Sequence, residues 1–234
     1  MKQMIIASTS TIHGSTYLAY LTDELTEFFN DIEELIFIPY ARPGGISHDD
    51  YTATAQKGLN KLGIKVTGLH TFKNPVEAIK NAKAVFTGGG NTFLLVTQLY
   101  KHNLIETIRE AVVDGVKYLG TSAGSNITGL TMQTTNDMPI IYPPSFKTLS
   151  LIPFNLNPHY QDPIEGSTHM GETRETRIKE FHTLNTQPVV GLREGSWLRV
   201  TGNEIKLKGE LSARIFELGK TPYEIATNTI LNFD

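Results

Sequence analysis

The first half of the chain alternates short apolar runs with amphipathic stretches, and this alternation limits the possible folds more than any other feature. The apolar runs have the length of buried strands and cover residues 4–7, 35–38, 65–69, 84–87 and 116–119. The stretches between them have helical spacing and cover residues 15–29, 49–62, the segment from 74 and residues 92–113. Alternating strands and helices predict a mostly parallel sheet with helices on both faces. We therefore expect a doubly wound α/β fold.

The second half of the chain has a different pattern. Residues 133–168 show little periodicity but contain scattered aromatic residues, which favours ordered loops. A charged helix is expected over residues 171–181, and short alternating runs follow from residue 189. We interpret these runs as antiparallel strands that extend one edge of the sheet. The 234 residues contain no internal repeat and fit a single domain, residues 1–234.

The composition excludes several classes of protein. Hydrophobic residues make up 39% and charged residues 19%, with a formal net charge of −3, so the chain is not expected to be disordered. No positive excess is available to neutralise phosphates, and no nucleic-acid partner is expected. The absence of cysteine excludes disulfides, thiolate metal sites and cysteine nucleophiles. No histidine pair has metal-ligand spacing, and Gly88–Gly90 lacks the ending of a phosphate loop, so neither metal nor cofactor is expected.

No apolar run approaches the ~18 residues that are needed to span a bilayer. The apolar run at the N-terminus is also shorter than the core of a signal peptide. We therefore expect no membrane association, and the simplest expectation is a soluble cytoplasmic protein. The sequence predicts no particular oligomeric state.

Two glycine-rich turns, residues 88–90 and 120–124, follow expected strands, and ligands bind at the carboxyl ends of strands in such sheets. The second turn, Gly120-Thr121-Ser122-Ala123-Gly124, matches G-x-S-x-G between a strand and a helix. Such a turn projects the hydroxyl of Ser122 above the sheet, and the N–H of Ala123 points at an incoming carbonyl oxygen. The alternative is a glycine-flanked turn with an unreactive serine.

A serine nucleophile needs a base within hydrogen-bond reach and a group that orients the base. Of seven histidines, His159 is the main candidate because it follows Asn157-Pro158 in a constrained loop downstream of the turn. His169 is its main rival. For the orienting acid, both Asp137 and Glu194 remain open on the residues alone.

Several segments taken together are more specific than the serine turn alone. They are Thr87–Phe93, Gly120–Asn126, Thr134–Pro139, Asn157–His159, Gly171–Glu175 and Leu192–Gly195. In this order, and spread over nearly the whole chain, they resemble the peptidase E family of aspartyl dipeptidases. That family uses a serine nucleophile and is related to the cyanophycinases.

The resemblance implies a flavodoxin-like fold of the class I glutamine amidotransferase type. It also implies that Ser122 is the nucleophile and His159 the base. Asp137 takes the position of the charge-relay acid, and Glu194 is the alternative. Gly90, together with Ala123, would supply the N–H groups of an oxyanion hole. The implied activity is metal-free hydrolysis of aspartyl dipeptides, Asp-Xaa, through an acyl-enzyme on Ser122, so the expected partner is a small peptide.

The sequence departs from the family pattern at two places. Thr121 stands where a tryptophan is expected beside the nucleophile, and residues 161–170 carry a small insertion. The first departure leaves a different preference open, for other N-terminal residues or for β-aspartyl linkages. A further alternative is a non-catalytic module that binds small anions.

The carboxylate of an aspartyl substrate calls for a guanidinium group, which pairs with both oxygens at once. Arg174 and Arg177 are three residues apart on the expected helix and share a face. We expect Arg174 to be the main carboxylate ligand, with Arg177 beside it. The alternative is a solvated helix face on which these arginines pair with neighbouring glutamates.

Overall fold

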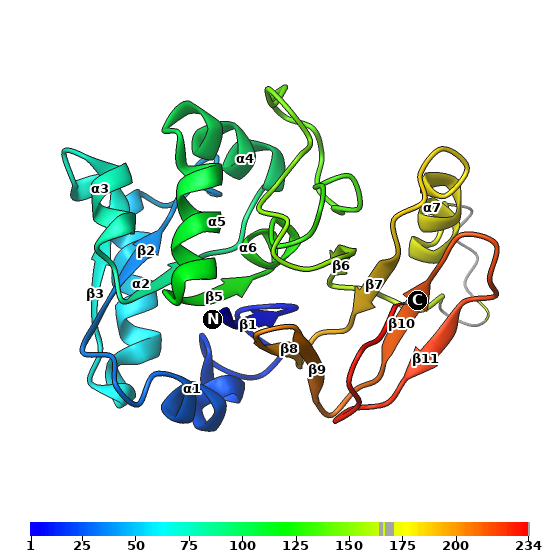
Figure 1. Ribbon diagram of the computed structural model, residues 1–234, viewed down its shortest axis with the longest axis horizontal. Helices are drawn as coiled ribbons and strands as arrows, with labels where there is room; N and C mark the ends of the chain where they lie inside the picture. The colour runs from blue at the N-terminus through cyan, green and yellow to red at the C-terminus, as the bar shows by residue number, and fades with distance from the viewer. Residues whose placement is uncertain (164–165, 167–170, 234) are drawn as a thin grey trace.

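The computed structural model describes residues 1–163, 166 and 171–233. A seven-stranded sheet with the order β3-β2-β4-β5-β1-β8-β9 forms its centre (Figure 1). The parallel strands are β1 (Gln3–Ala7), β2 (Glu34–Ile38), β3 (Lys65–Gly68), β4 (Ala84–Thr87) and β5 (Lys117–Thr121). The antiparallel edge consists of β8 (Ser196–Thr201) and β9 (Glu204–Gly209). The doubly wound α/β prediction is therefore confirmed.

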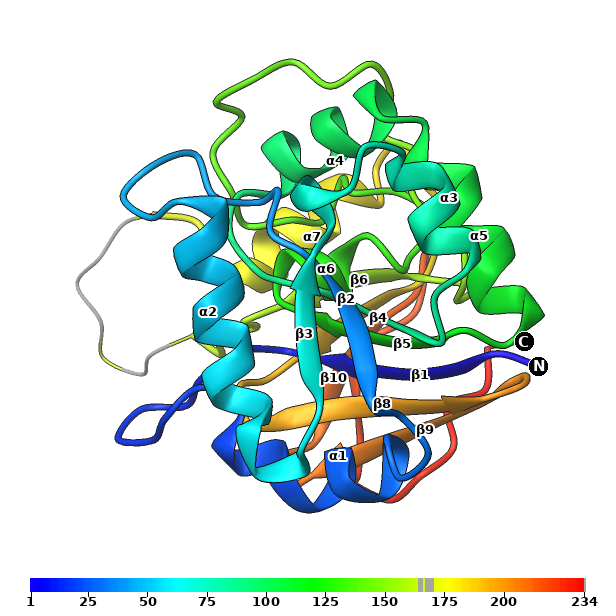
Figure 2. The same ribbon diagram turned by 90° about the vertical axis from the view of Figure 1, so that its left-hand side faces the viewer.

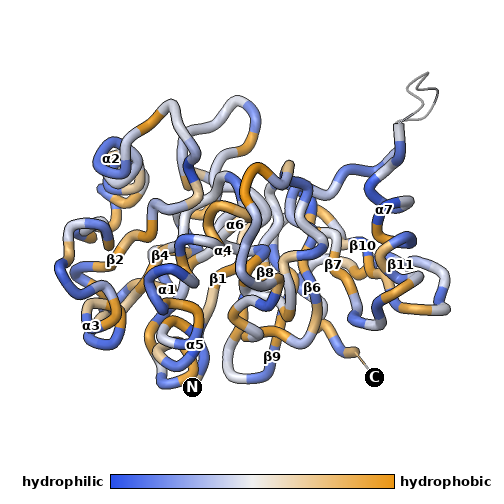
Figure 3. Tube along the Cα trace, turned by 90° about the horizontal axis from the view of Figure 1, so that it is seen from above, coloured by the Kyte–Doolittle hydropathy of each residue, from blue (hydrophilic) through white to orange (hydrophobic). Residues whose placement is uncertain are grey.

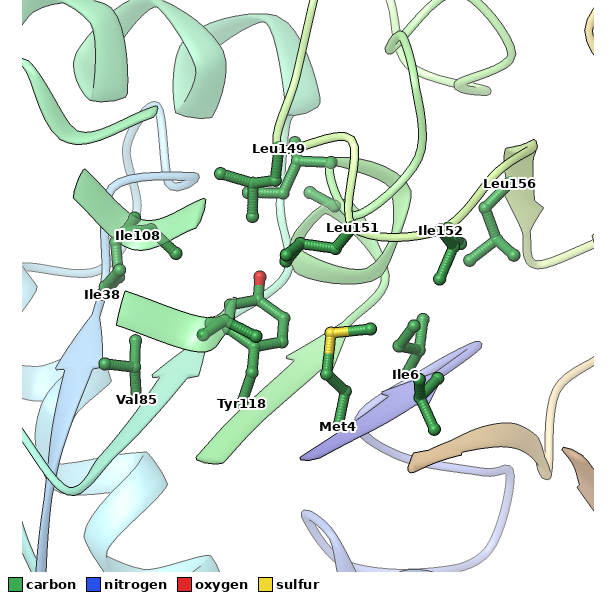
Figure 4. Packing of buried hydrophobic residues seen from close by; sticks show 14 of the residues in the cluster. Met4, Ile6, Ile38, Val85, Ile108, Tyr118, Leu149, Leu151, Ile152 and Leu156 are labelled. Carbon is green, nitrogen blue, oxygen red and sulfur yellow. The ribbon is translucent and has the colours of Figure 1, made fainter. Parts of the chain in front are cut away.

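Alternate residues of the central strands enter two separate hydrophobic layers, because side chains of a strand point to opposite faces. In β1, Met4 and Ile6 pack in one layer and Ile5 and Ala7 in the other. Figure 4 shows part of the first layer, with Met4 and Ile6 beside Tyr118 of β5. All of these side chains are fully buried, which is typical of a parallel sheet covered on both faces.

Helices cover both faces of the sheet (Figures 1 and 2). The second layer is closed by α1 (Thr22–Phe28) and α2 (His48–Leu59). The first is closed by α3 (Pro75–Lys80), α4 (Thr92–Lys101), α5 (Leu104–Asp114) and the short α6 (Ala123–Asn126). Asn74 and Asn91 begin α3 and α4 as caps, each accepting a hydrogen bond from a backbone N–H in the first turn.

A smaller, four-stranded sheet lies beside the first and has the order β11-β10-β7-β6 (Figure 1). Its strands are β6 (Asn155–Pro158), β7 (Val189–Leu192), β10 (Ala213–Phe216) and β11 (Tyr223–Ile225). The β6–β7 pair is parallel and the other pairs are antiparallel. The charged helix α7 (Arg174–Phe181) packs Ile178 against Tyr160, Val189 and Phe216, and its other residues are mostly hydrophilic (Figure 3).

Two expectations about the elements need correction. The C-terminal antiparallel strands extend the large sheet only as far as β8 and β9, because the chain turns at Gly209 (φ 99°) and β10 pairs with β7 instead. The helix expected from residue 15 begins only at Thr22, after a 3₁₀ turn, Ala19–Leu21. Leu18 has a φ of 58°, a left-handed conformation that cannot continue an α-helix.

The two glycine-rich turns meet at one edge of the large sheet. Strands β4 and β5 are parallel neighbours, and Thr87 lies opposite Gly120 in the register. Gly88–Gly90 and Gly120–Gly124 therefore leave the sheet side by side. The sequence placed both turns at carboxyl ends of strands, and the strand order that makes them neighbours comes from the structure. In the part of the chain that the structure describes, no helix has the length and apolar character to cross a membrane.

The contact between α6 and β4 requires a residue without a side chain. A Cβ atom on Gly124 would lie 2.1 Å from the carbonyl oxygen of Thr87, which is backbone and cannot rotate away. We expect Gly124→Ala to lower the free energy of unfolding by about 1–3 kcal/mol, measured by urea denaturation. Gly44, around which the structure leaves open space, supplies the control: Gly44→Ala should change stability by less than about 0.5 kcal/mol. Equal stability of the two variants would contradict the close contact.

Candidate active site

Ser122 forms the turn between β5 and α6 in a strained conformation. Its φ of 54° and ψ of −112° lie outside the regions that non-glycine residues ordinarily adopt. Backbone bonds hold it there: its N–H donates to the carbonyl of Ala7 (3.2 Å), and its own carbonyl accepts from Ser125 and Asn126 (both 2.9 Å). The hydroxyl of Ser125 also donates to the carbonyl of Ala7 (2.6 Å). Such strain persists only where the surrounding contacts fix it, and it is typical of functional sites.

The glycines around Ser122 are required by close approaches of backbone. A Cβ atom on Gly120 would lie 2.5 Å from the carbonyl oxygen of Gly124, within the same turn. A Cβ atom on Gly89 would lie 2.9 Å from the Cβ of Ser122. The first glycine-rich turn is thus packed directly against the serine, as an oxyanion-binding loop must be.

His159 reaches Ser122 from the smaller sheet. It follows β6, and its Nε2 lies 2.8 Å from the Oγ of Ser122. The imidazole is about one-third exposed (34%), so a small molecule can approach the pair. The structure therefore brings together the two side chains that the sequence proposed as nucleophile and base.

Glu194 contacts the other ring nitrogen of His159, with 2.6 Å between its Oε1 and Nδ1. Its place follows from strand pairing: β6 and β7 are parallel, and Pro158 lies opposite Leu192. The residues just beyond these two strands therefore leave the sheet together. A carboxylate on Nδ1 favours the tautomer with its proton there, which leaves Nε2 free to accept a proton from the serine.

The preference for Asp137 as the orienting acid is corrected by its contacts. Its Oδ2 accepts hydrogen bonds from the N–H (2.7 Å) and the hydroxyl (2.6 Å) of Thr92, and from the hydroxyl of Thr135 (3.0 Å). Thr92 is the first residue of α4, where the helix dipole favours a carboxylate. Among the described residues, Glu194 is the carboxylate that contacts His159.

The two candidate oxyanion groups flank Ser122. Ala123 is the first residue of α6, so its N–H cannot make an intrahelical bond. Gly90 has a φ of 143°, and a Cβ atom on it would lie 2.3 Å from the carbonyl oxygen of Ala41. The N–H of Asn91 donates to that same carbonyl (2.7 Å), which fixes the turn. The geometry thus keeps both turns rigid beside the serine hydroxyl.

Arg174 is the first residue of α7, where the helix dipole does not favour a cation. Within the described part of the chain its guanidinium makes no ion pair or hydrogen bond. Partial burial, and then the charge of Arg177, lower its pKa, while Asp137 acts in the opposite direction. A half-buried arginine that pairs with no described acid has its N–H groups available to a ligand carboxylate.

Arg177 has different surroundings, although it lies one turn further along α7. Its guanidinium is 3.7 Å from Glu172 and more than half exposed. It borders a cavity of about 380 Å³ whose other walls include Phe93, Phe146 and Phe181. The structure therefore separates the two arginines: Arg174 is within range of the charge of Asp137, and Arg177 borders an aromatic cavity between α4 and α7.

Thr121 does not line an open site, although it precedes the nucleophile. It is fully buried, and it lies on the face of β5 that α1 and α2 cover. Its hydroxyl lies near that of Tyr17, whose pKa is raised mainly by burial. A threonine in place of the tryptophan expected from the family pattern therefore changes the packing beneath the nucleophile.

Two buried hydroxyl groups that support the site escaped the sequence analysis. Tyr51 of α2 donates to the carbonyl of Gly89 (3.0 Å), and Ser8 accepts from the backbone N–H of His159 (2.9 Å). The sequence could have indicated Ser8, because it directly follows the first buried strand and so lies at the edge of the sheet where ligands bind. It could not have indicated Tyr51, because the partner of Tyr51 is distant in the chain.

His169, the rival of His159, lies outside the described residues. Within the residues that are described, no group of three or more His, Asp or Glu side chains could hold a metal ion.

Residues 4–208 match the model of peptidase family S51. The chain is 48% identical to a protein of Streptomyces coelicolor named peptidase E, over 98% of this chain and 93% of that protein. It is 43% identical to a Drosophila melanogaster protein named "Probable alpha-aspartyl dipeptidase", over 99% and 97% of the two chains.

Two solved structures share the fold. One, a protein of Listeria monocytogenes EGD-e, has a TM-score of 0.68 and 22% identity, and covers 89% of this chain and 98% of its own. The other, a peptidase from an acI-B1 Actinobacterium, has a TM-score of 0.74 and 17% identity, and covers 100% and 97%. The matched family and the extent of these likenesses agree with the serine-centred geometry. The chain belongs to peptidase family S51 and is a serine peptidase.

Proposed function

We propose that the chain is a dipeptidase that hydrolyses N-terminal aspartyl dipeptides, Asp-Xaa, through an acyl-enzyme on Ser122. One observation carries the proposal: the hydrogen-bonded row from the Oγ of Ser122 through His159 to Glu194, with distances of 2.8 Å and 2.6 Å. The names of the Streptomyces and Drosophila relatives support the substrate class.

In the first half-reaction, Nε2 of His159 takes the proton of the Ser122 hydroxyl as Oγ attacks the carbonyl carbon of the aspartyl residue. Glu194 stabilises the imidazolium that forms. The tetrahedral intermediate collapses, the C–N bond breaks, and His159 gives its proton to the leaving amine. The products are an aspartyl ester on Ser122 and the free C-terminal amino acid.

In the second half-reaction, water replaces the departed amine. His159 takes a proton from the water, whose oxygen attacks the ester carbonyl, and then returns that proton to Oγ as aspartate leaves. In both steps the N–H groups of Gly90 and Ala123 stabilise the negative oxygen. The N-terminus of α6 adds its positive potential at the same point.

Arg174 is the proposed ligand of the substrate's side-chain carboxylate. It is half-buried, lies within range of the charge of Asp137 and has no ion-pair partner among the described residues. Partial burial strengthens a guanidinium–carboxylate pair because water screens it less. Asp137 would keep Arg174 in place through its charge and leave the guanidinium N–H groups to the substrate.

The alternatives differ in substrate or in chemistry. A preference for another N-terminal residue or for β-aspartyl linkages keeps the same serine chemistry. A non-catalytic module that binds small anions would use the glycine turns and Arg174 alone. Ser122 has a strained backbone, and the imidazole of His159 lies within hydrogen-bond reach of its hydroxyl. Anion binding needs neither the strain nor the imidazole, so both features favour catalysis over the last alternative.

The substrate class is tested with a panel of dipeptides that differ at the N-terminal residue. We expect the wild-type protein to hydrolyse Asp-Leu and to lose several orders of magnitude in kcat/KM with Asn-Leu and Ala-Leu. Ser122→Ala should reduce kcat on Asp-Leu by about 10⁶, as for a comparable triad. Equal rates across the panel would contradict the aspartyl preference and leave only serine hydrolysis. Near-normal activity of Ser122→Ala would contradict the acyl-enzyme.

The role of Arg174 is tested by Arg174→Met, which keeps the length of the side chain and removes the charge. We expect kcat/KM for Asp-Leu to fall about 10–100-fold, since hydrogen bonds to charged groups contribute about 1.5–3 kcal/mol. The residual rate with Asn-Leu should change little. Arg177→Met is the matched control on the same helix and should have a much smaller effect. A larger fall of kcat/KM in Arg177→Met than in Arg174→Met would instead assign the substrate's side-chain carboxylate to Arg177.

The orienting acid is tested by the rate at which a small neutral fluorophosphate labels Ser122, because this readout does not depend on recognition of the substrate. We expect Glu194→Gln to slow labelling about 10²–10⁴-fold, since the amide no longer holds the productive tautomer of His159. Asp137→Asn should stay within about 10-fold of wild type, because Asp137 contacts α4 and not His159. Slower labelling of Asp137→Asn than of Glu194→Gln would contradict this division of roles.

A further inference from the structure

We propose that Ser8 is a positioning residue whose single hydroxyl sets the geometry of both His159 and Glu194. The inference rests on the proposed function, because it concerns the same base and acid. The hydroxyl of Ser8 makes no hydrogen bond to Ser122, and it would act only through the two segments that it joins.

Ser8 stands at the carboxyl end of β1, a strand at the centre of the large sheet. The residue is fully buried, and its backbone N–H donates to the carbonyl of Ser196 in the antiparallel neighbour β8 (3.1 Å). Ser8 is therefore held by the buried large sheet. Hydrogen bonds to Ser8 can thus fix the position of a more exposed loop.

The hydroxyl of Ser8 joins two segments of the smaller sheet. It accepts a hydrogen bond from the backbone N–H of His159 (2.9 Å) and donates one to the carbonyl of Leu192 (2.7 Å). Leu192 is the last residue of β7, two positions before Glu194. Both loops that carry the proposed base and acid are thus held by one oxygen atom.

His159 needs such support because its backbone is strained. Its φ is 54°, in the left-handed region that is uncommon for residues other than glycine. Conformations of this kind persist where surrounding contacts fix them. The bond from its N–H to Ser8 is such a contact, and the N–H of Tyr160 adds a second, to the carbonyl of Leu192 (3.1 Å).

The neighbour of Ser8 holds the nucleophile. The carbonyl of Ala7, the last residue of β1, accepts from the backbone N–H of Ser122 (3.2 Å), so two consecutive residues, Ala7 and Ser8, contact the proposed nucleophile and base. The two groups that hold Ser122 and His159, the carbonyl of Ala7 and the hydroxyl of Ser8, therefore belong to neighbouring residues. This closeness fixes the distance between the nucleophile and the base. A change at Ser8 would move the base relative to the nucleophile without moving the nucleophile itself.

Removal of the hydroxyl leaves two backbone groups without their partner. An unsatisfied buried polar group costs about 1–3 kcal/mol, so the loops would shift to find other partners. A misplacement of about 1 Å at the reacting groups can cost about 10²-fold in rate. We expect Ser8→Ala to lower kcat on Asp-Leu about 10–100-fold and to leave KM within about threefold of wild type, because Arg174 and the glycine turns are untouched.

Ser196→Ala is the matched control. Ser196 is also a fully buried serine at the same edge between β1 and β8, and its hydroxyl donates to the carbonyl of Leu211 (3.0 Å). Its hydroxyl makes no hydrogen bond to His159, Leu192 or Glu194. A merely structural role predicts similar losses of thermal stability and of kcat in both variants. The positioning role predicts similar losses of stability but a fall of kcat in Ser8→Ala alone.

Two further measurements complete the test. Ser8→Thr keeps the hydroxyl, and we expect it to recover most of kcat relative to Ser8→Ala. A crystal structure of Ser8→Ala should show the Nε2 of His159 beyond hydrogen-bond distance of Ser122 Oγ, or in a second conformer, while Ser196→Ala keeps the wild-type distance. Unchanged kcat in Ser8→Ala, or an unchanged Ser122–His159 distance in its crystal structure, would overturn the proposal.

Failure of the proposed function has a different signature. If wild-type protein does not hydrolyse Asp-Leu or any dipeptide of the panel, the proposed activity is wrong. The crystal structures of Ser8→Ala and Ser196→Ala still decide whether the hydroxyl positions His159.

Discussion

The bonds between the end of β1 and the residues around it are the constraint on which the rest of the site depends. Ala7 accepts from the backbone N–H of Ser122, and Ser8 accepts from that of His159. Because β1 lies between β5 and β8, these bonds couple the serine turn of one sheet to the loops of the other. In a parallel sheet the carboxyl ends of all strands face the same way. This edge can therefore gather groups that are far apart in the sequence.

The proposed base and acid come from the smaller sheet, and a polar network joins the loops that carry them. Arg193, between Leu192 and Glu194, binds Asp162 through two nitrogens (2.8 Å and 2.7 Å) and Glu224 of β11 through two more contacts (2.9 Å and 3.0 Å). Its side chain is only 14% exposed, so these pairs are less screened by water than surface ion pairs. The segment after His159 and the residue before Glu194 are thereby joined a second time, in addition to their bonds to Ser8.

The sequence was sufficient for the elements that depend on local patterns. Ser122 lies in a turn whose glycines, strand and helix are contiguous. The pairing of β4 with β5, which brings the two glycine-rich turns together, depends on the strand order and could not be read from the sequence. His159 could be selected because it follows Asn157-Pro158, although the structure shows these two residues to be the end of strand β6 and not the expected loop. The choice between Asp137 and Glu194 could not be made from the sequence. It depends on whether β6 pairs with β7, and the residues that pair in these two strands are about thirty positions apart in the chain. The placement of β10 and β11 in the smaller sheet could not be predicted for the same reason, because it depends on pairing with β7, which is distant in the chain.

Asp137 illustrates how a residue can fit a motif and still act elsewhere. Its position between Ser122 and His159 in the chain matches the order of a serine triad, yet its carboxylate is held by Thr92 at the start of α4. From there its charge acts on Arg174 and opposes the lowering of the arginine's pKa by burial and by Arg177. No described acid contacts the guanidinium directly, so its N–H groups stay open. In the mechanism that we propose, Glu194 orients the base, and Asp137 stabilises the cation that recognises the substrate.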